Sequence, residues 1–144
     1  MFSTIRSLFR KREEPQKVVA VPLLGEMEWS HDDEAWVGNA QGFRFSLGYD
    51  GQATPSESLV GYARDILSDA QWLTSTFAEA KAEAIRSYEG YYEEEIRSLS
   101  FESIHFYDFK GANRILADLE PGREDRCWRI EYADRRCEGI GFDD

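Results

Sequence analysis

Apolar and polar residues alternate with a period of two over residues 25–49, which is the pattern of half-buried strands. At the start of this stretch Met27 and Trp29 alternate with acidic residues. Polar turns are predicted at residues 31–34 and 39–42, with a short strand between them. The pattern therefore predicts a three-stranded antiparallel meander.

Helical spacing replaces this alternation in the middle of the chain. Residues 54–57 (Thr-Pro-Ser-Glu) form a capping box, in which the threonine hydroxyl accepts from the Glu57 amide and the proline fits the first helical position. Apolar residues three and four apart then continue over residues 59–88, with a bend predicted near residues 69–75. Gly90 is the predicted end of this helix pair.

Strand-like alternation returns after a charged connector at residues 91–100. Four strands are predicted, at residues 103–107, 115–119, 128–132 and 140–142. Turns are predicted at residues 110–113 and 134–135. The clearest pair is the last one, in which a tight turn places Tyr132 opposite Cys137.

This order of clustered strands, clustered helices and clustered strands predicts the α+β class. We expect an antiparallel sheet, made of the three-stranded N-terminal meander plus about four C-terminal strands, with a central helix pair packed on one face. A chain of 144 residues with 42% hydrophobic positions suits one domain with one core. We assign that single α+β domain to residues 18–144.

Residues 1–17 form a separate basic amphipathic segment, in which apolar positions three and four apart face a cationic side. The residues expected to dock on a membrane or a partner are Phe2, Ile5, Arg6, Leu8, Phe9, Arg10, Lys11 and Arg12. Such a helix binds anionic membrane surfaces through both its charge and its apolar face. The alternative is a frayed terminus or a helix docked on its own domain, and Pro15 ends the segment in either case.

The formal net charge of the whole chain is −11. Because the first 17 residues carry a net positive charge, the negative charge lies in residues 18–144. An acidic body repels phosphate backbones, so we expect no direct nucleic-acid binding. It attracts a basic protein, although the charge is also explained by solubility alone. Four acidic residues of the helix pair and connector are the predicted partner-binding residues: Glu79, Glu83, Glu93 and Glu94.

The two cysteines, Cys127 and Cys137, are not expected to form a disulfide. The predicted hairpin places Cys127 opposite Phe142, about 16 Å along the ladder from Cys137. The longest early apolar run, residues 18–24, is short and contains Pro22, so no secretory or membrane-spanning segment is predicted. We expect a cytoplasmic protein with reduced thiols, membrane-associated only if the N-terminal segment binds lipid.

No catalytic residue, metal site or cofactor is predicted. His31 begins the run His31-Asp32-Asp33-Glu34, but consecutive turn residues point in different directions and rarely converge on one ion. His105 is expected on the polar side of a strand, beside Ser103 and Tyr107. The chain has neither a nucleophile elbow nor a glycine-rich phosphate loop.

The chain resembles a family of small bacterial domains of unknown function, some of which are regarded as immunity proteins of polymorphic toxin systems. The resemblance covers residues 24–144 and is carried by scattered glycine and aromatic positions. These are Gly25-Glu26-Met27-Glu28-Trp29, Trp36-Val37-Gly38, Gly42-Phe43, Trp128-Arg129-Ile130-Glu131-Tyr132 and Gly141-Phe142-Asp143-Asp144. What the resemblance implies is a small cytosolic α+β protein that binds and blocks a partner.

Three functional hypotheses follow. The first is a non-enzymatic protein-interaction module, an immunity-type inhibitor that binds a basic partner protein. The second is a peripheral membrane or assembly adaptor that uses the basic N-terminal helix. The third is an uncharacterised enzyme with a site near His105 and Tyr107, which predicts a concave site containing an acid-base group with a strongly shifted pKa. The sequence leaves the oligomeric state open.

Overall fold

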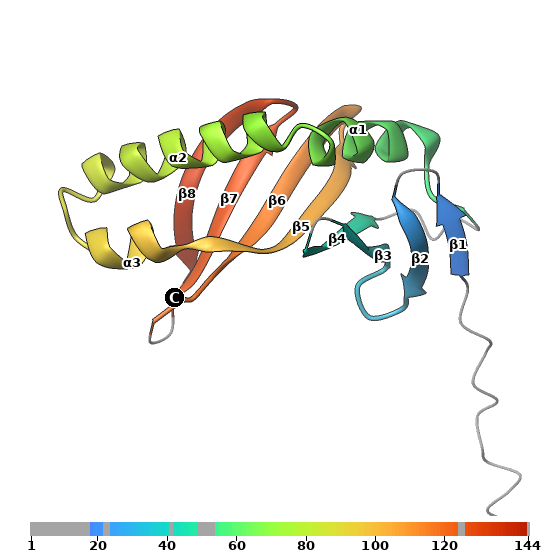
Figure 1. Cartoon of the computed structure of the whole chain (residues 1–144), viewed down its shortest axis with the longest axis horizontal. Helices are drawn as coiled ribbons and strands as arrows, with labels where there is room; N and C mark the ends of the chain where they lie inside the picture. The colour runs from blue at the N-terminus through green and yellow to red at the C-terminus, as the bar shows by residue number, and fades with distance from the viewer. Residues whose placement is uncertain (1–17, 22–23, 41, 49–53, 124–125, 144) are drawn as a thin grey trace, which may run out of the picture.

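The computed structural model describes residues 18–21, 24–40, 42–48, 54–123 and 126–143, which form eight strands and three helices (Figure 1). The strands are β1 (Val18–Val21), β2 (Gly25–Ser30), β3 (Ala35–Ala40), β4 (Phe43–Gly48), β5 (Ser100–Phe109), β6 (Ala112–Glu120), β7 (Cys127–Ala133) and β8 (Arg136–Asp143). The helices, α1 (Glu57–Leu67), α2 (Ala70–Ser87) and α3 (Glu93–Ser98), lie between β4 and β5 in the chain.

All eight strands belong to one sheet whose spatial order is the order of the chain, β1 to β8. Every neighbouring pair is antiparallel except β4 and β5, which are parallel. Parallel neighbours need a long crossover connection, and the three helices provide it. The predicted α+β class with a mostly antiparallel sheet is confirmed, with eight strands where about seven were predicted because β1 adds a fourth strand to the N-terminal meander.

The alternation seen in the sequence becomes the two faces of this sheet. In β7, Trp128, Ile130 and Tyr132 are buried, whereas Arg129 and Glu131 between them are exposed. The same alternation in the other strands from β2 to β8 places one row of large apolar side chains toward the helices. The opposite row is polar, and we call it the open face of the sheet.

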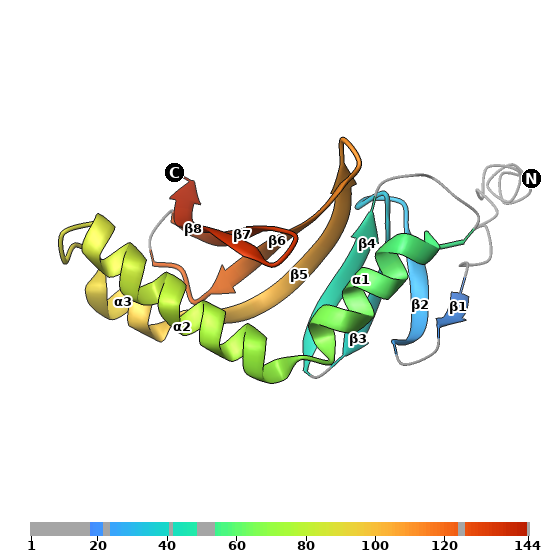
Figure 2. The same cartoon turned by 90° about the horizontal axis from the view of Figure 1, so that it is seen from above.

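Helices α1 and α2 pack on the apolar face (Figure 2). The ring of Tyr62 in α1 meets the edge of Phe106 in β5, with ring centroids 5.7 Å apart. In α2, Trp72 contacts Tyr132 with centroids 5.5 Å apart. Aromatic pairs in this geometry contribute beyond the area that they bury, so they hold the helices against the sheet.

The first helix begins later than the capping box predicted. Its N-cap is Ser56, whose side chain makes no capping hydrogen bond, and the first helical residue is Glu57. The prediction of Thr54 as N-cap was therefore wrong by two residues. The bend predicted near residues 69–75 is a break between two helices, where Asp69 caps α2 by accepting a hydrogen bond from the backbone N–H of Trp72.

The connector predicted at residues 91–100 contains a third helix, α3, and this is a correction to the predicted helix pair. Only 3% of Glu95 is exposed, so the acidic run at residues 93–95 is not entirely a solvated face. Its carboxylate accepts hydrogen bonds from the indole of Trp128 at 2.9 Å and from Arg126 at 2.7 Å. These partners come from the β6–β7 region, which a local pattern could not reveal.

The last hairpin follows the predicted pairing at its turn and departs from it further along. Tyr132 pairs with Cys137 as predicted, but Cys127 pairs with Asp143 rather than with Phe142. A bulge after Glu131 inserts one extra residue in β8 and shifts the register by one. Both cysteines are free thiols.

Candidate functional site

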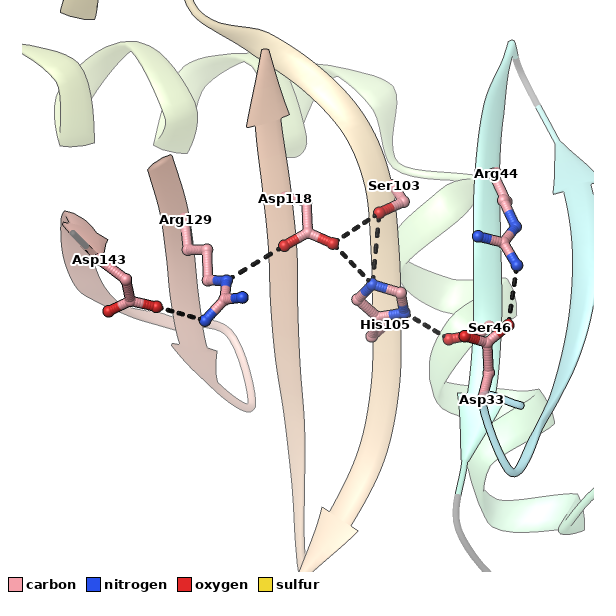
Figure 3. Close-up of polar contacts among 8 residues, drawn as sticks. All are labelled: Asp33, Arg44, Ser46, Ser103, His105, Asp118, Arg129 and Asp143. Carbon is pink, nitrogen blue, oxygen red and sulfur yellow. Dashed lines mark hydrogen bonds and ion pairs between the residues drawn. The ribbon is translucent and has the colours of Figure 1, made fainter. Parts of the chain in front are cut away.

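A row of polar side chains crosses the open face of the sheet (Figure 3). Its members come from the β2–β3 turn and from strands β4 to β8: Asp33, Arg44, Ser46, Ser103, His105, Asp118, Arg129 and Asp143. Hydrogen bonds and ion pairs join the members from Ser46 to Asp143 across the strands, and a separate ion pair joins Arg44 to Asp33. We call this set the polar row.

Strand register brings these residues together although they are distant in sequence. Ser46 in β4 lies beside His105 in β5, and Asp118 in β6 lies beside Arg129 in β7. Each member that lies on a strand alternates with a core residue of that strand, so these side chains project to the face away from the helices. The parallel pairing of β4 with β5 is what places Ser46 next to His105.

His105 is held through both of its ring nitrogens. Its Nδ1 lies 2.6 Å from the hydroxyl oxygen of Ser46, and its Nε2 lies 3.0 Å from Oδ2 of Asp118. The hydroxyl of Ser103 donates to the same carboxylate oxygen at 3.0 Å. About 32% of the His105 side chain remains exposed, so the ring is oriented without being sealed from solvent.

Asp118 is the most strongly perturbed carboxyl of the polar row. The hydrogen bond from His105 is the largest cause that lowers its pKa to about 2, partial burial opposes it, and the hydrogen bonds from Ser103 and Arg129 lower the pKa further. Asp118 is therefore ionised at neutral pH and acts only as an acceptor. A neutral His105 then carries its proton on Nε2, which leaves Nδ1 as the acceptor for the Ser46 hydroxyl.

Charged pairs occupy the two ends of the polar row. Arg129 bridges Asp118 at 3.2 Å and Asp143 at 2.5 Å. At the other end, Arg44 lies 2.9 Å from Asp33. The hydrogen bond from Ser30 is the largest cause and lowers the pKa of Asp33, burial opposes it, and the contact with Arg44 lowers the pKa further. The charged members at the two ends of the row are therefore already paired with one another.

A pocket of about 180 Å³ opens beside the centre of the polar row. Asp33, Ser46, His105 and Tyr107 contribute its polar lining, and Leu116 is among its apolar walls. A larger hollow of about 340 Å³ lies over β7 and β8, where glycines leave the sheet without side chains. The smaller pocket is the one lined by the hydroxyl groups of Ser46 and Tyr107 and by the imidazole of His105.

The N-terminal meander is acidic, and one of its acids, Asp33, lines this pocket. Residues 24–48 contain five acidic side chains and one cationic side chain, Arg44. All five acids are exposed, and they are Glu26, Glu28, Asp32, Asp33 and Glu34. We call this set the acidic meander, and one of its members, Asp33, also belongs to the polar row.

The residues predicted to bind a partner lie on the helices, apart from the polar row. Glu79 and Glu83 are in α2, whereas Glu93 and Glu94 are in α3, and all four are exposed. Glu83 pairs with Arg86 and Glu93 pairs with Arg97, at 2.5 and 2.7 Å. The structure brings these four acids onto the helical layer and not into the site at His105.

Other predicted features lie elsewhere. The docking residues of the N-terminal segment, between Phe2 and Arg12, are outside the described residues. His31 is exposed in the β2–β3 turn against the edge of the Trp29 ring. Within the described part of the chain, no group of three His, Cys, Asp or Glu residues could hold a metal ion. None of the described helices is long and apolar enough to span a membrane.

Sequence reasoning placed His105 on a polar strand face beside Ser103 and Tyr107, but it missed Ser46, Asp118 and Arg129. Each of the missed residues occupies a polar position of an alternating strand, and this alternation predicts that its side chain lies on the polar face of the sheet. Their proximity depends on which strands are neighbours. The β4–β5 contact spans 59 residues of sequence, and no local pattern specifies it.

No family model, curated protein or solved structure matches this chain. The resemblance to small bacterial immunity-type domains therefore stays a prediction from scattered residues.

Proposed function

We propose that this chain is a protein-binding module, an immunity-type inhibitor that binds a basic partner protein through the open face of its sheet. The observation that carries the proposal is the one-sided covering of the sheet, whose described helices all lie on its apolar face (Figures 1 and 2). The other face carries the polar row (Figure 3), whose members Asp33, Arg44, Arg129 and Asp143 are exposed to solvent. A sheet face of this kind offers a broad surface to a folded partner.

The charge of the acidic meander supports a basic partner. Residues 24–48 contain these five acids and only one arginine, so the segment has a net negative charge. Glu26 and Glu28 are exposed on β2. Opposite charge on two partners accelerates their encounter and excludes partners of like charge. The expected partner therefore carries lysine and arginine side chains on the surface that it presents.

The order of the polar row supports recognition as well as attraction. The side chains of Ser46, His105 and Asp118 are already fixed by hydrogen bonds in the free chain. Side chains that are fixed before binding lose less conformational entropy when the partner arrives. The polar row is thus suited to specificity, whereas the acidic meander is suited to attraction.

Affinity capture from the native host tests this proposal with two matched triple charge reversals. The first variant changes Glu26, Glu28 and Asp32 to lysine on the acidic meander. The control changes the helical residues Glu79, Glu83 and Glu94 to lysine, which alters the net charge by the same amount. We expect the full-length chain to capture a basic protein stoichiometrically, in a manner weakened by salt.

The meander variant should lose that protein, and the helical control should retain it. Loss with the helical control alone would move the binding surface to α2 and α3. Equal capture by both variants at every salt concentration would contradict electrostatic recognition. A version lacking residues 1–14 distinguishes the adaptor hypothesis from the inhibitor hypothesis. An adaptor would no longer capture membrane material after that deletion.

A further inference from the structure

We propose that Ser46, His105 and Asp118 form a hydrolytic centre in which Ser46 is the nucleophile and small carboxylic esters are the substrates. This activity goes beyond the proposed binding function, although it uses side chains of the same polar row. It rests on the geometry of three side chains and on the pocket that two of them, Ser46 and His105, line. The sequence contains no local motif for such a centre, because its members come from three different strands.

The arrangement of the three side chains meets the geometric requirement for an activated hydroxyl. The Ser46 oxygen lies 2.6 Å from Nδ1 of His105, within hydrogen-bond distance of a general base. The far nitrogen of the ring, Nε2, lies 3.0 Å from the carboxylate of Asp118. A nucleophile that contacts a base, which in turn contacts a carboxylate that orients it, has the arrangement of a catalytic triad. A triad is recognised by these roles and not by the strands that supply its members.

The environment holds the base in the form that catalysis needs. Asp118 accepts from Nε2–H, so Nδ1 keeps its lone pair toward the Ser46 hydroxyl. Ser103 and Arg129 also donate to Asp118, at 3.0 and 3.2 Å, and keep its carboxylate oriented. Asp118 is therefore a positioning residue, whereas Ser46 and His105 are the groups that would touch the reacting atoms.

The reaction is an acyl transfer to water in two steps. Ser46 Oγ attacks the ester carbonyl carbon while its proton moves to Nδ1 of His105. The carbon–oxygen bond to the alcohol breaks, the alcohol takes that proton, and the acyl group remains as an ester of Ser46. Water then attacks this ester, returns a proton through His105 to Ser46 Oγ, and releases the carboxylic acid.

The pocket limits the acyl group that can reach Ser46. Its volume of about 180 Å³ is below the range of about 300–1,000 Å³ that is typical of pockets for larger ligands. Tyr107 and Leu116 line this pocket, so the space that would hold the acyl group of the substrate is partly apolar. We therefore expect acetyl and propionyl esters to be accepted and octanoyl esters to be excluded.

Covalent labelling with a fluorophosphonate probe is the first test. The probe should modify the full-length chain at Ser46, as located by mass spectrometry of its peptides. Ser46→Ala and His105→Asn should abolish that modification, whereas Ser75→Ala, at an exposed position of α2, should not change it. Circular dichroism of each variant establishes that it is folded. Absence of labelling at Ser46 in the folded wild-type chain overturns the proposal.

Hydrolysis of p-nitrophenyl acetate and p-nitrophenyl octanoate is the second test. We expect Ser46→Ala to lower kcat/KM for the acetate by at least about 100-fold, the scale of a lost acid-base partner. Asp118→Asn should lower kcat by a similar factor and leave KM within about twofold, which a merely structural role would not produce. Equal rates for wild type and Ser46→Ala assign the turnover to other surface groups and overturn the proposal.

Discussion

Glu95 and Asp118 are two carboxylates that each accept hydrogen bonds from three residues, yet they lie on opposite sides of the sheet. Glu95 lies under α3 on the helical side, where the backbone N–H of Arg123 and the side chains of Arg126 and Trp128 donate to it. Its side chain is 3% exposed. All three partners are hydrogen-bond donors, and none of them has a role in the proposed hydrolytic centre.

Asp118 lies on the open face, and about 35% of its side chain is exposed. One of its three donors is His105, whose second ring nitrogen faces the hydroxyl of Ser46 and a solvent-accessible pocket. The number of hydrogen bonds therefore does not distinguish the structural carboxylate Glu95 from Asp118, the carboxylate of the proposed hydrolytic centre. What separates them is access to solvent and the presence of a partner that can still exchange a proton.

Removal of Glu95 should have the largest effect on stability. Glu95→Ala leaves the mostly buried Arg126 without its carboxylate and the buried Trp128 indole without an acceptor, so we expect a loss of about 3–5 kcal/mol in the free energy of unfolding. Urea denaturation measures this loss. Glu94→Ala, at the exposed neighbouring position, is the matched control and should stay within about 0.5 kcal/mol of wild type. A loss below 1 kcal/mol for Glu95→Ala would contradict its structural role.

Asp118→Asn should cost less, because its side chain is partly solvated. The lowered pKa of about 2, against an ordinary value of 3.8, means that the ionised form is favoured by folding. After allowance for screening, we expect about 1–2 kcal/mol at pH 7. The contribution is fully present above pH 4 and is lost as the pH falls toward 2. Urea titrations across that window should show a stability difference between wild type and Asp118→Asn that shrinks with acid.

Ser103→Ala should have a smaller effect on the same carboxylate. It removes one donor to Asp118 from a side chain that is nearly buried, which costs about 1 kcal/mol. The pKa of Asp118 should rise toward its ordinary value, and carboxyl NMR titration measures that rise. An unchanged pKa would mean that His105 and Arg129 hold Asp118 without help from Ser103.

Arg44→Ala should have the smallest effect on stability. The Arg44–Asp33 pair is about half exposed at both side chains, and exposed ion pairs contribute roughly 0–1 kcal/mol. We expect a loss within about 0.5 kcal/mol by urea denaturation. A loss above 1.5 kcal/mol would show that this end of the polar row is as integral to the fold as the Glu95 cluster.

The elements of the fold could be predicted from the sequence where their periodicity was strong. The alternation of Trp128, Ile130 and Tyr132 located β7, and the helical spacing after Leu59 located α1 and α2. The four-residue strand β1 and the six-residue helix α3 were missed, because segments of this length show too little of either period.

The candidate site could be predicted only in part, for a different reason. Alternation placed His105 on a polar face, but its partners depend on strand order and register. Ser46 is 59 residues away along the chain, and its position depends on the parallel pairing of β4 with β5. Loop closure and packing decide such pairings across the whole domain, so they are not encoded in a local pattern.

The parallel β4–β5 junction also has a consequence for how the chain folds. On each side of it, β1 to β4 and β5 to β8 connect neighbours through short turns, so each meander consists of contacts that are local in sequence. Joining the two meanders closes a loop that includes all three helices, and contacts of long sequence separation form slowly. We therefore expect each meander to form early and the junction to close late. Because Ser46 and His105 meet across that junction, the proposed reactive centre would be assembled in the final stage of folding.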